Sequence, residues 1–295
     1  MPVARYLIDG LASGFVIALM GLGVVVIYRS TRVLTFAQGA LASFNAYLFF
    51  QFSVLWGWPV ALAFAVAVVA AAGVGAASER LAIAPLRRAD PITRTVATLG
   101  LVLALQVGMR VIWGGSEQFV PPLVRGTISI GSETVGAQTL LIVGVTAVVT
   151  LALAVWFRRS LTGLALAATA DDPTAASLLG VSAARVSIVS WVLASTLGAL
   201  AGILLTPLLV LNPWQMTFLM VSGYAAALIG GFVSLPLTVA GGVVIGIVRS
   251  AVTSEVAVAG LSETLGFIAV FAVLVLTRAR TTRPADLLGG ERTPL

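Results

Sequence analysis

Three residue types that carry much of protein chemistry are missing from this sequence of 295 residues, which has no cysteine, no histidine and no lysine. Without cysteine the chain forms no disulfide and offers no thiolate. Without histidine it has no imidazole base, proton relay or imidazole ligand. Without lysine it cannot complete the G-x-x-x-x-G-K-[ST] loop that holds nucleotide phosphates. We therefore expect no enzyme, no metal and no cofactor, and any use of ATP would need a second chain.

Charge is also scarce, since charged residues make up 9% of the chain and hydrophobic residues 59%. About nine apolar stretches of roughly 18–25 residues are each long enough to cross a hydrocarbon core of about 30 Å. We predict an all-α, polytopic transmembrane helix bundle of about nine spans (eight to ten), with a membrane domain at 1–280 and a cytoplasmic polar tail at 281–295. The expected spans are 6–28, 36–55, 58–78, 92–113, 138–157, 185–211, 215–233, 235–252 and 262–277.

The arginines indicate how the chain lies in the membrane. If the N-terminus is outside, four arginines fall outside and thirteen fall in cytoplasmic segments, as the positive-inside rule predicts. Their dispersal among loops favours anionic lipid headgroups over nucleic acid as the partner of the net charge of +6. The thirteen are Arg29, Arg32, Arg80, Arg87, Arg88, Arg94, Arg158, Arg159, Arg185, Arg278, Arg280, Arg283 and Arg292, and the four are Arg5, Arg110, Arg125 and Arg249.

The second apolar stretch opens with a polar, glycine-containing segment, 35–39. Irregular backbone at membrane depth is tolerated only where it is buried in protein or lines a water-filled cavity. We therefore expect a broken or re-entrant helix at this place.

Ionisable residues are missing from the centres of the expected spans, which disfavours a proton relay or a carboxylate cation site. The polar groups that remain inside are uncharged. They either hydrogen-bond between helices, for about 0.6–2 kcal/mol each, or line a path for a small polar solute. The candidate path residues are Thr35, Gln38, Asn45, Thr98 and Gln106.

The segment 158–184 carries the local signals of a short helix. Asp172 suits the N-cap, Pro173 the first helical position, and Gly180 the left-handed residue beyond the end. Leu178 and Leu179 are then available for packing. So short a helix is marginal in water, so we expect it either to pack on its own bundle or to insert into a cytoplasmic partner. Asp90 and Pro91 repeat the cap and proline at the start of the fourth span.

Four blocks of residues, in order along nearly the whole chain, are similar to blocks of one transporter family. The chain resembles the permease subunits of branched-chain amino acid ABC importers, of the LivH/LivM type. The blocks are Leu34 to Ala40; Glu79-Arg80 to Arg87 with Ala97 to Gly100; Gly163 to Gly180 with Ala199 to Gly202; and Gly230-Gly231 with Ser234 to Pro236 and Gly241-Gly242.

We expect an inner-membrane permease of a bacterium that works by alternating access, and the arginine distribution predicts that its N-terminus is outside and its C-terminus cytoplasmic. The resemblance adds the partners of such a permease. Two cytoplasmic ATPase subunits, a second identical or similar permease, and an extracytoplasmic solute-binding protein are the implied partners. It also implies that Gly163 to Gly180 is the element that couples to the ATPases.

Several positions depart from the family pattern. Thr35 stands where the family usually has Asn, and Ala167 where it usually has Arg; further departures are Val233, Leu237, Thr238 and Arg249. Urea or short amides therefore stay open as solutes beside amino acids. An ion-coupled transporter or channel stays open as the alternative mechanism.

Overall fold

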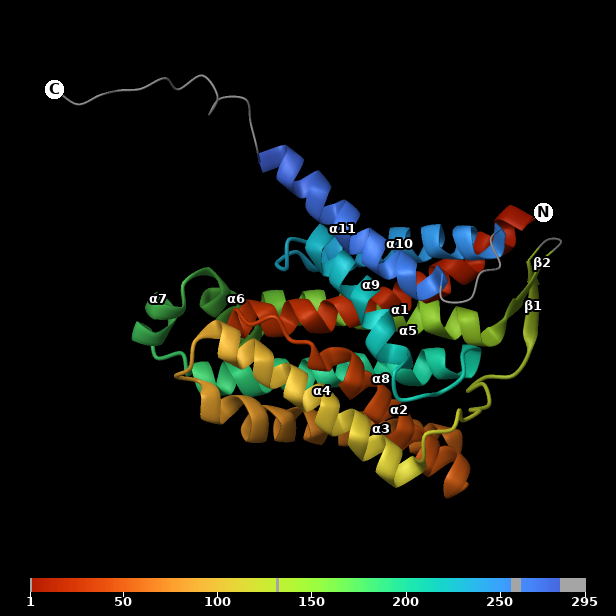
Figure 1. Ribbon diagram of the computed structural model, residues 1–295, viewed down its shortest axis with the longest axis horizontal. Helices are drawn as coiled ribbons and strands as arrows, with labels where there is room; N and C mark the ends of the chain where they lie inside the picture. The colour runs from red at the N-terminus through yellow and green to blue at the C-terminus, as the bar shows by residue number, and fades with distance from the viewer. Residues whose placement is uncertain (1, 131–132, 256–260, 282–295) are drawn as a thin grey trace.

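The structure is a computed structural model that describes residues 2–130, 133–255 and 261–281, almost all of them helical (Figure 1). The α-helices are α1 Pro2–Thr31, α2 Ala37–Phe50, α3 Val60–Ser78, α4 Pro91–Trp113, α5 Ala137–Arg159, α6 Leu161–Asp171, α7 Pro173–Leu178, α8 Ala183–Leu205, α9 Gln215–Ile229, α10 Leu235–Glu255 and α11 Leu261–Thr281. Single π-helical turns, Gln51–Leu55 and Glu79–Ile83, follow α2 and α3, and 3₁₀ turns lie at Ala84–Leu86 and Thr206–Leu208. The predicted all-α membrane bundle is confirmed.

The expected number of about nine spans is not confirmed. Among the described residues, six helices are long and apolar enough to cross a membrane. The other three apolar stretches of the sequence hold shorter apolar helices: α2 has 14 residues, α9 has 15, and the apolar part of α11 covers Thr264–Val275. The stretch predicted at 36–55 is α2 with the π-helical turn that continues it to Leu55, and the stretch predicted at 215–233 holds α9, which ends earlier, at Ile229. The six are Tyr6–Thr31, Val60–Leu86, Pro91–Trp113, Ala137–Arg159, Ala183–Leu208 and Leu235–Glu255.

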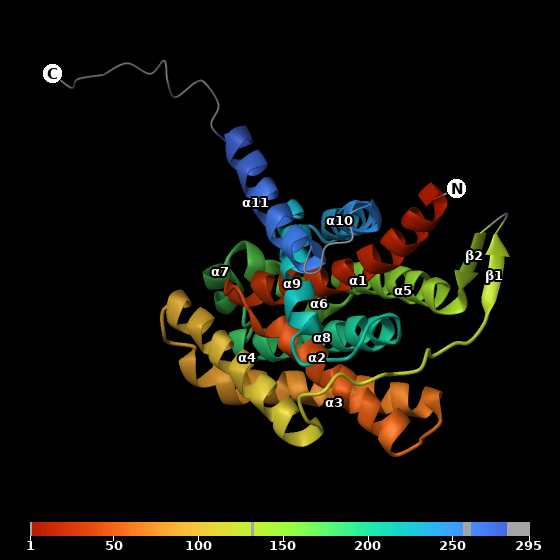
Figure 2. The ribbon, with the colours of Figure 1, turned by 45° about the vertical axis from the view of Figure 1, so that its right-hand side comes forward.

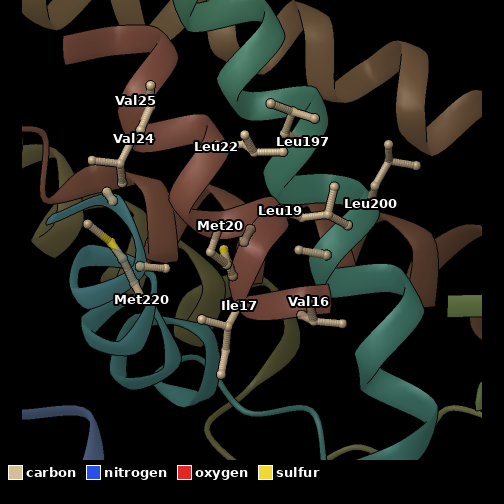
Figure 3. Packing of buried hydrophobic residues seen from close by; sticks show 14 of the residues in the cluster. Val16, Ile17, Leu19, Met20, Leu22, Val24, Val25, Leu197, Leu200 and Met220 are labelled. Carbon is tan, nitrogen blue, oxygen red and sulfur yellow. The ribbon is translucent and has the colours of Figure 1, made fainter. Parts of the chain in front are cut away.

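Helix α1 lies at the centre of the bundle and packs against α5, α8, α9 and α10. Small residues allow the closest of these contacts: an ideal Cβ on Gly246 of α10 would lie 2.2 Å from the Cα of Gly14. In lipid such close backbone approach favours helix association through dispersion contacts. Figure 3 shows the core that results, with Val16, Ile17, Leu19, Met20, Leu22, Val24 and Val25 of α1 beside Leu197 and Leu200 of α8 and Met220 of α9.

The two groups α1–α4 and α8–α11 repeat one packing pattern. The first helix of each group packs against the second and third helices of the other group: α1 against α9 and α10, and α8 against α2 and α3. Within each group the second helix packs against the fourth: α2 against α4, and α9 against α11. Helices α1 and α8 run in opposite directions (Figure 1). The arrangement is that of an inverted internal repeat, although the sequence itself shows no clear repeat.

The second helix is broken in the way the sequence predicts. Helix α1 ends at Thr31, residues 32–35 are not helical, and Arg32 has a φ of +53°. The chain turns back into the bundle before α2 begins (Figure 1). Gln38, in the first turn of α2, contacts Ala194, near the middle of α8. Helix α2 thus starts well inside the bundle.

The two ends of the bundle differ in character. The end of α1, the start of α4, the end of α5, the start of α8 and the whole of α7 lie together at one end, on the left in Figure 1 and again in Figure 2. We call it the arginine-rich end, because Arg29, Arg94, Arg158, Arg159 and Arg185 belong to these segments.

At the opposite end an antiparallel hairpin joins β1, Thr127–Ile130, to β2, Glu133–Gly136, with Thr127 opposite Gly136. The all-α prediction missed this hairpin. Its strands are short and rich in β-branched residues, and the glycines and prolines around them are typical of an irregular loop. The polar tail expected at 281–295 lies outside the described residues beyond Thr281.

Candidate functional site

Two of the candidate path residues, Gln38 and Asn45, point from α2 towards α8. The side-chain amide of Gln38 donates to the carbonyl of Ala194 at 2.8 Å, and that of Asn45 donates to the hydroxyl of Ser195 at 3.1 Å. Both side chains are fully buried. Glycine makes the room, because an ideal Cβ on Gly23 would lie 2.1 Å from the Gln38 amide nitrogen.

The N-cap residue of α2 does not cap the helix with its own side chain, and Thr35 and Thr98 accept hydrogen bonds from the backbone N–H groups at the start of α2. The hydroxyl of Thr98, on α4, accepts from the backbone N–H of Phe36 at 3.1 Å, and that of Thr35 accepts from Ala37 at 3.3 Å. The carbonyl of Thr35 in turn accepts from the hydroxyl of Tyr224 on α9. Free N–H groups at a buried helix start need such partners, and here a second helix supplies one of them.

Gln106 connects α4 to the first turn of α9. Its side-chain amide donates to the carbonyl of Pro213 at 2.8 Å and to the hydroxyl of Thr217 at 2.9 Å. The same turn of α9 lies directly on α2, since an ideal Cβ on Gly39 would be 2.6 Å from the Cα of Thr217. The first turns of the two short helices therefore cross inside the bundle, with Gln106 beside them.

The five candidate path residues thus lie on α2, on the segment just before it, and on the neighbouring helix α4. Each is 3% exposed or less, and each takes part in hydrogen bonds that link neighbouring segments. Sequence reasoning missed Thr217, which only its contact with Gln106, 111 residues away, identifies.

The chemistry available at this cluster is that of uncharged donors and acceptors. Buried oxygens without a hydrogen-bond partner remain on Gln38, Ser43, Asn45 and Gln106. Among the described residues no group of three or more acidic residues could hold a metal ion. Such a set offers hydrogen-bond acceptors without a fixed charge.

The second candidate site is the pair of short helices α6 and α7 at the arginine-rich end. The hydroxyl of Ser160 caps α6 by accepting from the N–H of Gly163 at 2.9 Å. An ideal Cβ on Gly163 would lie 2.5 Å from the carbonyl oxygen of Trp156 and 2.7 Å from the Cα of Phe157. Gly163, a predicted coupling residue, therefore serves the close packing of α6 on the last turn of α5.

Helix α7 has the caps that the sequence predicts. The carboxylate of Asp172 accepts from the N–H groups of Thr174 and Ala175 at 2.8 and 3.0 Å, and Pro173 is the first helical residue. Gly180 has a φ of +84° just beyond the end. Leu178 and Leu179 are 84% and 83% exposed. These leucines do not pack on the bundle, so α7 presents an apolar tip to its surroundings.

The loop between α3 and α4 lies at the same end and is fixed by two carboxylates. Glu79 is fully buried and accepts a hydrogen bond from the guanidinium of Arg87. Asp90 caps α4, as predicted, by accepting from the N–H and the hydroxyl of Thr93 at 3.0 and 2.6 Å. These hydrogen bonds favour the charged carboxylate, the Thr93 hydroxyl most of all, so the pKa of Asp90 lies below its ordinary value.

Curated relatives match nearly the full length of this chain. The high-affinity branched-chain amino acid transport system permease protein LivH of Escherichia coli K12 is 29% identical, over 97% of this chain and 95% of the relative. BraD of Pseudomonas aeruginosa, a permease protein of the same description, is 26% identical over 83% of this chain and 85% of the relative. A probable branched-chain amino acid transport permease protein LivH of Methanocaldococcus jannaschii is 27% identical over 92% and 88%.

The fold is also shared with a solved structure, a chain of PsaBC from Streptococcus pneumoniae in complex with Fab. The TM-score is 0.50 at 13% sequence identity, over 91% of this chain and 89% of that one. A family model described as "Branched-chain amino acid transport system / permease component" matches residues 6–277. Since this match covers most of the sequence, the chain belongs to the family of permease components of branched-chain amino acid transport systems.

Proposed function

We propose that this chain is the membrane-spanning subunit of an ATP-driven importer that carries amino acids, branched-chain amino acids first, into the cell. The observation that carries the proposal is α7, a capped helix with exposed Leu178 and Leu179 at the arginine-rich end. Two exposed leucines at the tip of a helix form an apolar patch of the kind that marks contact with a partner protein. The chain has no lysine for a phosphate-binding loop, so the partner supplies the ATPase.

The arginine-rich end is the cytoplasmic end in this proposal. Positive residues are retained on the cytoplasmic side, and α1 ends there, which puts the N-terminus outside (Figure 1). The C-terminal tail is then cytoplasmic, and the protein lies in a bacterial inner membrane. The hairpin of β1 and β2, at the opposite end, faces the extracytoplasmic solute-binding protein. A second permease subunit completes the complex.

Transport proceeds by alternating access, with the solute passing along α2. Thr35, Gln38, Asn45, Thr98 and Gln106 line the path once α2 and α9 separate at Gly39 and Thr217, where they now touch. The uncharged donors and acceptors along α2 support a zwitterionic or neutral solute. Their hydrogen bonds between helices hold the path closed in the present arrangement.

A pull-down from native membranes in mild detergent tests this function. The tagged chain should recover a P-loop ATPase and a second permease, identified by mass spectrometry. Membrane vesicles holding the complex should take up radiolabelled leucine when ATP is supplied inside. Recovery of the chain alone, with uptake driven by an ion gradient, would point to a secondary transporter instead. Uptake of urea or short amides in preference to leucine would move the solute to that class.

Single cysteines test the path directly, since the chain has none of its own. Cysteines at Gln38, Asn45 and Thr98 should react with a water-soluble maleimide during ATP turnover and stay protected in resting complex. A cysteine at Gly100, on the exposed face of α4, is the lipid-facing control. Labelling at the three sites that equals the control in both states would contradict the path.

A further inference from the structure

We propose that Arg29 is a positioning residue that links the α6–α7 unit to the central helix α1, and through it to the start of α2. The inference rests on the proposed function, because it assigns the route by which motion of α7 reaches the solute path. It is carried by the packing of α6, by the surroundings of Arg29, and by the short chain segment that joins α1 to α2.

Helices α6 and α7 form one unit, since only Asp172 lies between them. Its backbone N–H closes the last turn of α6 by donating to Ala168 at 3.0 Å, and its carboxylate caps α7. Ala176 of α7 is buried, while the leucines at the tip are exposed. Because a single residue that bonds to both helices separates them, a force on α7 is passed to α6.

Helix α6 packs against α1 and α5. Its buried side chains are Leu166, Thr169 and Ala170, which lie on one face, three and one residues apart along the helix. Leu161 and Leu164 lie on the opposite face and are exposed, so α6 meets the bundle through the face of Leu166, Thr169 and Ala170 alone. The contact between the two helices is therefore where a displacement of α7 first reaches the centre of the bundle.

Arg29, in the last turn of α1, lies where α1, α5 and α6 meet. The central carbon of its guanidinium is 4.9 Å from the ring centroid of Phe157 on α5. The carboxylate of Asp171, the last residue of α6, attracts this charge from beyond salt-bridge distance. The side chain is partly buried, and its Nε has no hydrogen-bond partner. A cation held over an aromatic ring and near a carboxylate resists separation of the three helices.

Only a short segment of chain separates Arg29 from the candidate path residues at the start of α2. Helix α1 ends two residues later, at Thr31, and Thr35 and Gln38 follow four and seven residues after that end. Near the end of α1 the N–H of Val33 donates to the hydroxyl of Thr31 at 3.3 Å, which holds the exit from the helix in place. The irregular segment 32–36 then connects α1 to α2 directly.

Arg32 offers a matched control at the same end of α1. Its guanidinium lies 5.9 Å from the ring of Tyr28, which belongs to α1 itself, and its side chain is exposed. Replacing Arg32 removes the same charge from the same region. It leaves the contacts among α1, α5 and α6 in place.

The experiment uses the whole complex, purified with its ATPase and reconstituted in liposomes, and measures leucine taken up per ATP hydrolysed. Arg29→Gln should leave assembly intact and lower this ratio by about tenfold, within the usual range of coupling between sites. Arg32→Gln should leave the ratio unchanged. Arg29→Lys should restore part of it, because lysine keeps the charge and loses the planar stacking.

A second variant tests whether Arg29 acts together with Asp171 or only through its own positive charge. Asp171→Asn should lower the same ratio, and the double variant with Arg29→Gln should be no worse than Arg29→Gln alone, as expected for two residues of one contact. An unchanged ratio in Arg29→Gln, or equal losses in Arg29→Gln and Arg32→Gln, would overturn the inference. Failure of the unaltered chain to recover any ATPase would instead refute the proposed function.

Discussion

Two short helices of this protein, α2 and α7, are built in opposite ways. Helix α2 is almost entirely buried, and no side chain caps its N-terminus in the usual way. Its first N–H groups find partners in Thr35 just before it and in Thr98 on another helix. Helix α7 is mostly exposed and is capped by its own neighbour, Asp172.

The difference shows what fixes each helix. The start of α2 takes one of its hydrogen bonds from Thr98 of α4, and its buried side chains bond to α8, so α2 depends on these helices being in place. Helix α7 carries its own start and stop signals, so it forms on the surface and keeps its leucines free. Disturbing the bundle should therefore damage α2, and disturbing the surface should affect only what α7 binds.

The largest expected effect tests the dependence of α2 on its neighbours. Gly39→Ala places a Cβ 2.6 Å from the backbone of Thr217, and such overpacking costs about 1–3 kcal/mol. We expect a matching fall in the free energy of unfolding of the detergent-solubilised chain. Gly100→Ala is the control, because nothing lies within 4 Å of its Cβ position. Equal stability of the two variants would show that α2 and α9 do not need this contact.

The second prediction concerns α7, where we expect an effect on partner binding and none on stability. Leu178→Asp with Leu179→Asp should leave unfolding unchanged, because both side chains are exposed. Recovery of the ATPase should fall at least about tenfold, as for the loss of an interface hot spot. Leu81→Asp, an exposed leucine in the turn after α3, is the control. A normal yield of ATPase with the double variant would remove α7 from the interface.

A third prediction weakens α7 from within. Asp172→Ala removes the cap and should cost about 1 kcal/mol locally. Hydrogen exchange at the amides of Thr174 and Ala175 should quicken, while Asp172→Asn, which keeps an acceptor, should behave nearly as the original chain does. No change in exchange with the alanine variant would mean that α7 is held by something other than its cap.

A fourth prediction sharpens the account of α2. The hydrogen bond from Asn45 to Ser195 should contribute about 0.6 kcal/mol, the usual value between membrane helices. A double-mutant cycle with Asn45→Ala and Ser195→Ala, measured by unfolding in bicelles, gives this value. Additive losses in the cycle would show that the two side chains do not stabilise each other.

The smallest effect concerns Asp90, a local cap on a membrane helix. Its pKa is lower in the folded chain than in the unfolded one. Its stabilisation is therefore complete above the ordinary carboxyl pKa of about 3.9 and is lost as the pH falls through the lower folded value. Amide exchange at Thr93 should quicken only in strongly acidic solution. Asp90→Asn should abolish this pH dependence, and its persistence would assign it to another group.

The same contrast explains what the sequence could predict. The caps of α7 and α4 were predictable residue by residue, because Asp172, Gly180 and Asp90 act on backbone groups within a few positions. The break before α2 was predictable from the polar residues 35–39 at the start of an apolar stretch. Both predictions rest on local physics, and the structure confirms the geometry of each.

Partners far apart in the sequence were not predictable. Gln38 meets Ala194 across 156 residues, and Gln106 meets Thr217 across 111. Nothing local in the chain indicates which helix faces which polar side chain. The candidate path residues were chosen for being polar inside apolar stretches, a criterion that finds buried polar groups well. It does not separate those that hold helices together from those that touch a solute, and their role in transport stays a prediction.

The close fit of α1 against α10 has a consequence for how the protein is made. Roughly 200 residues separate the end of α1 from the start of α10, and at translation rates of about 5–20 residues per second they take about 10–40 s to synthesise. During that time Gly10 and Gly14 face lipid or a chaperone, because the helix that will cover them does not yet exist. Helix α1 is thus made well before the helix that completes its packing, and its contact with α10 forms late in synthesis.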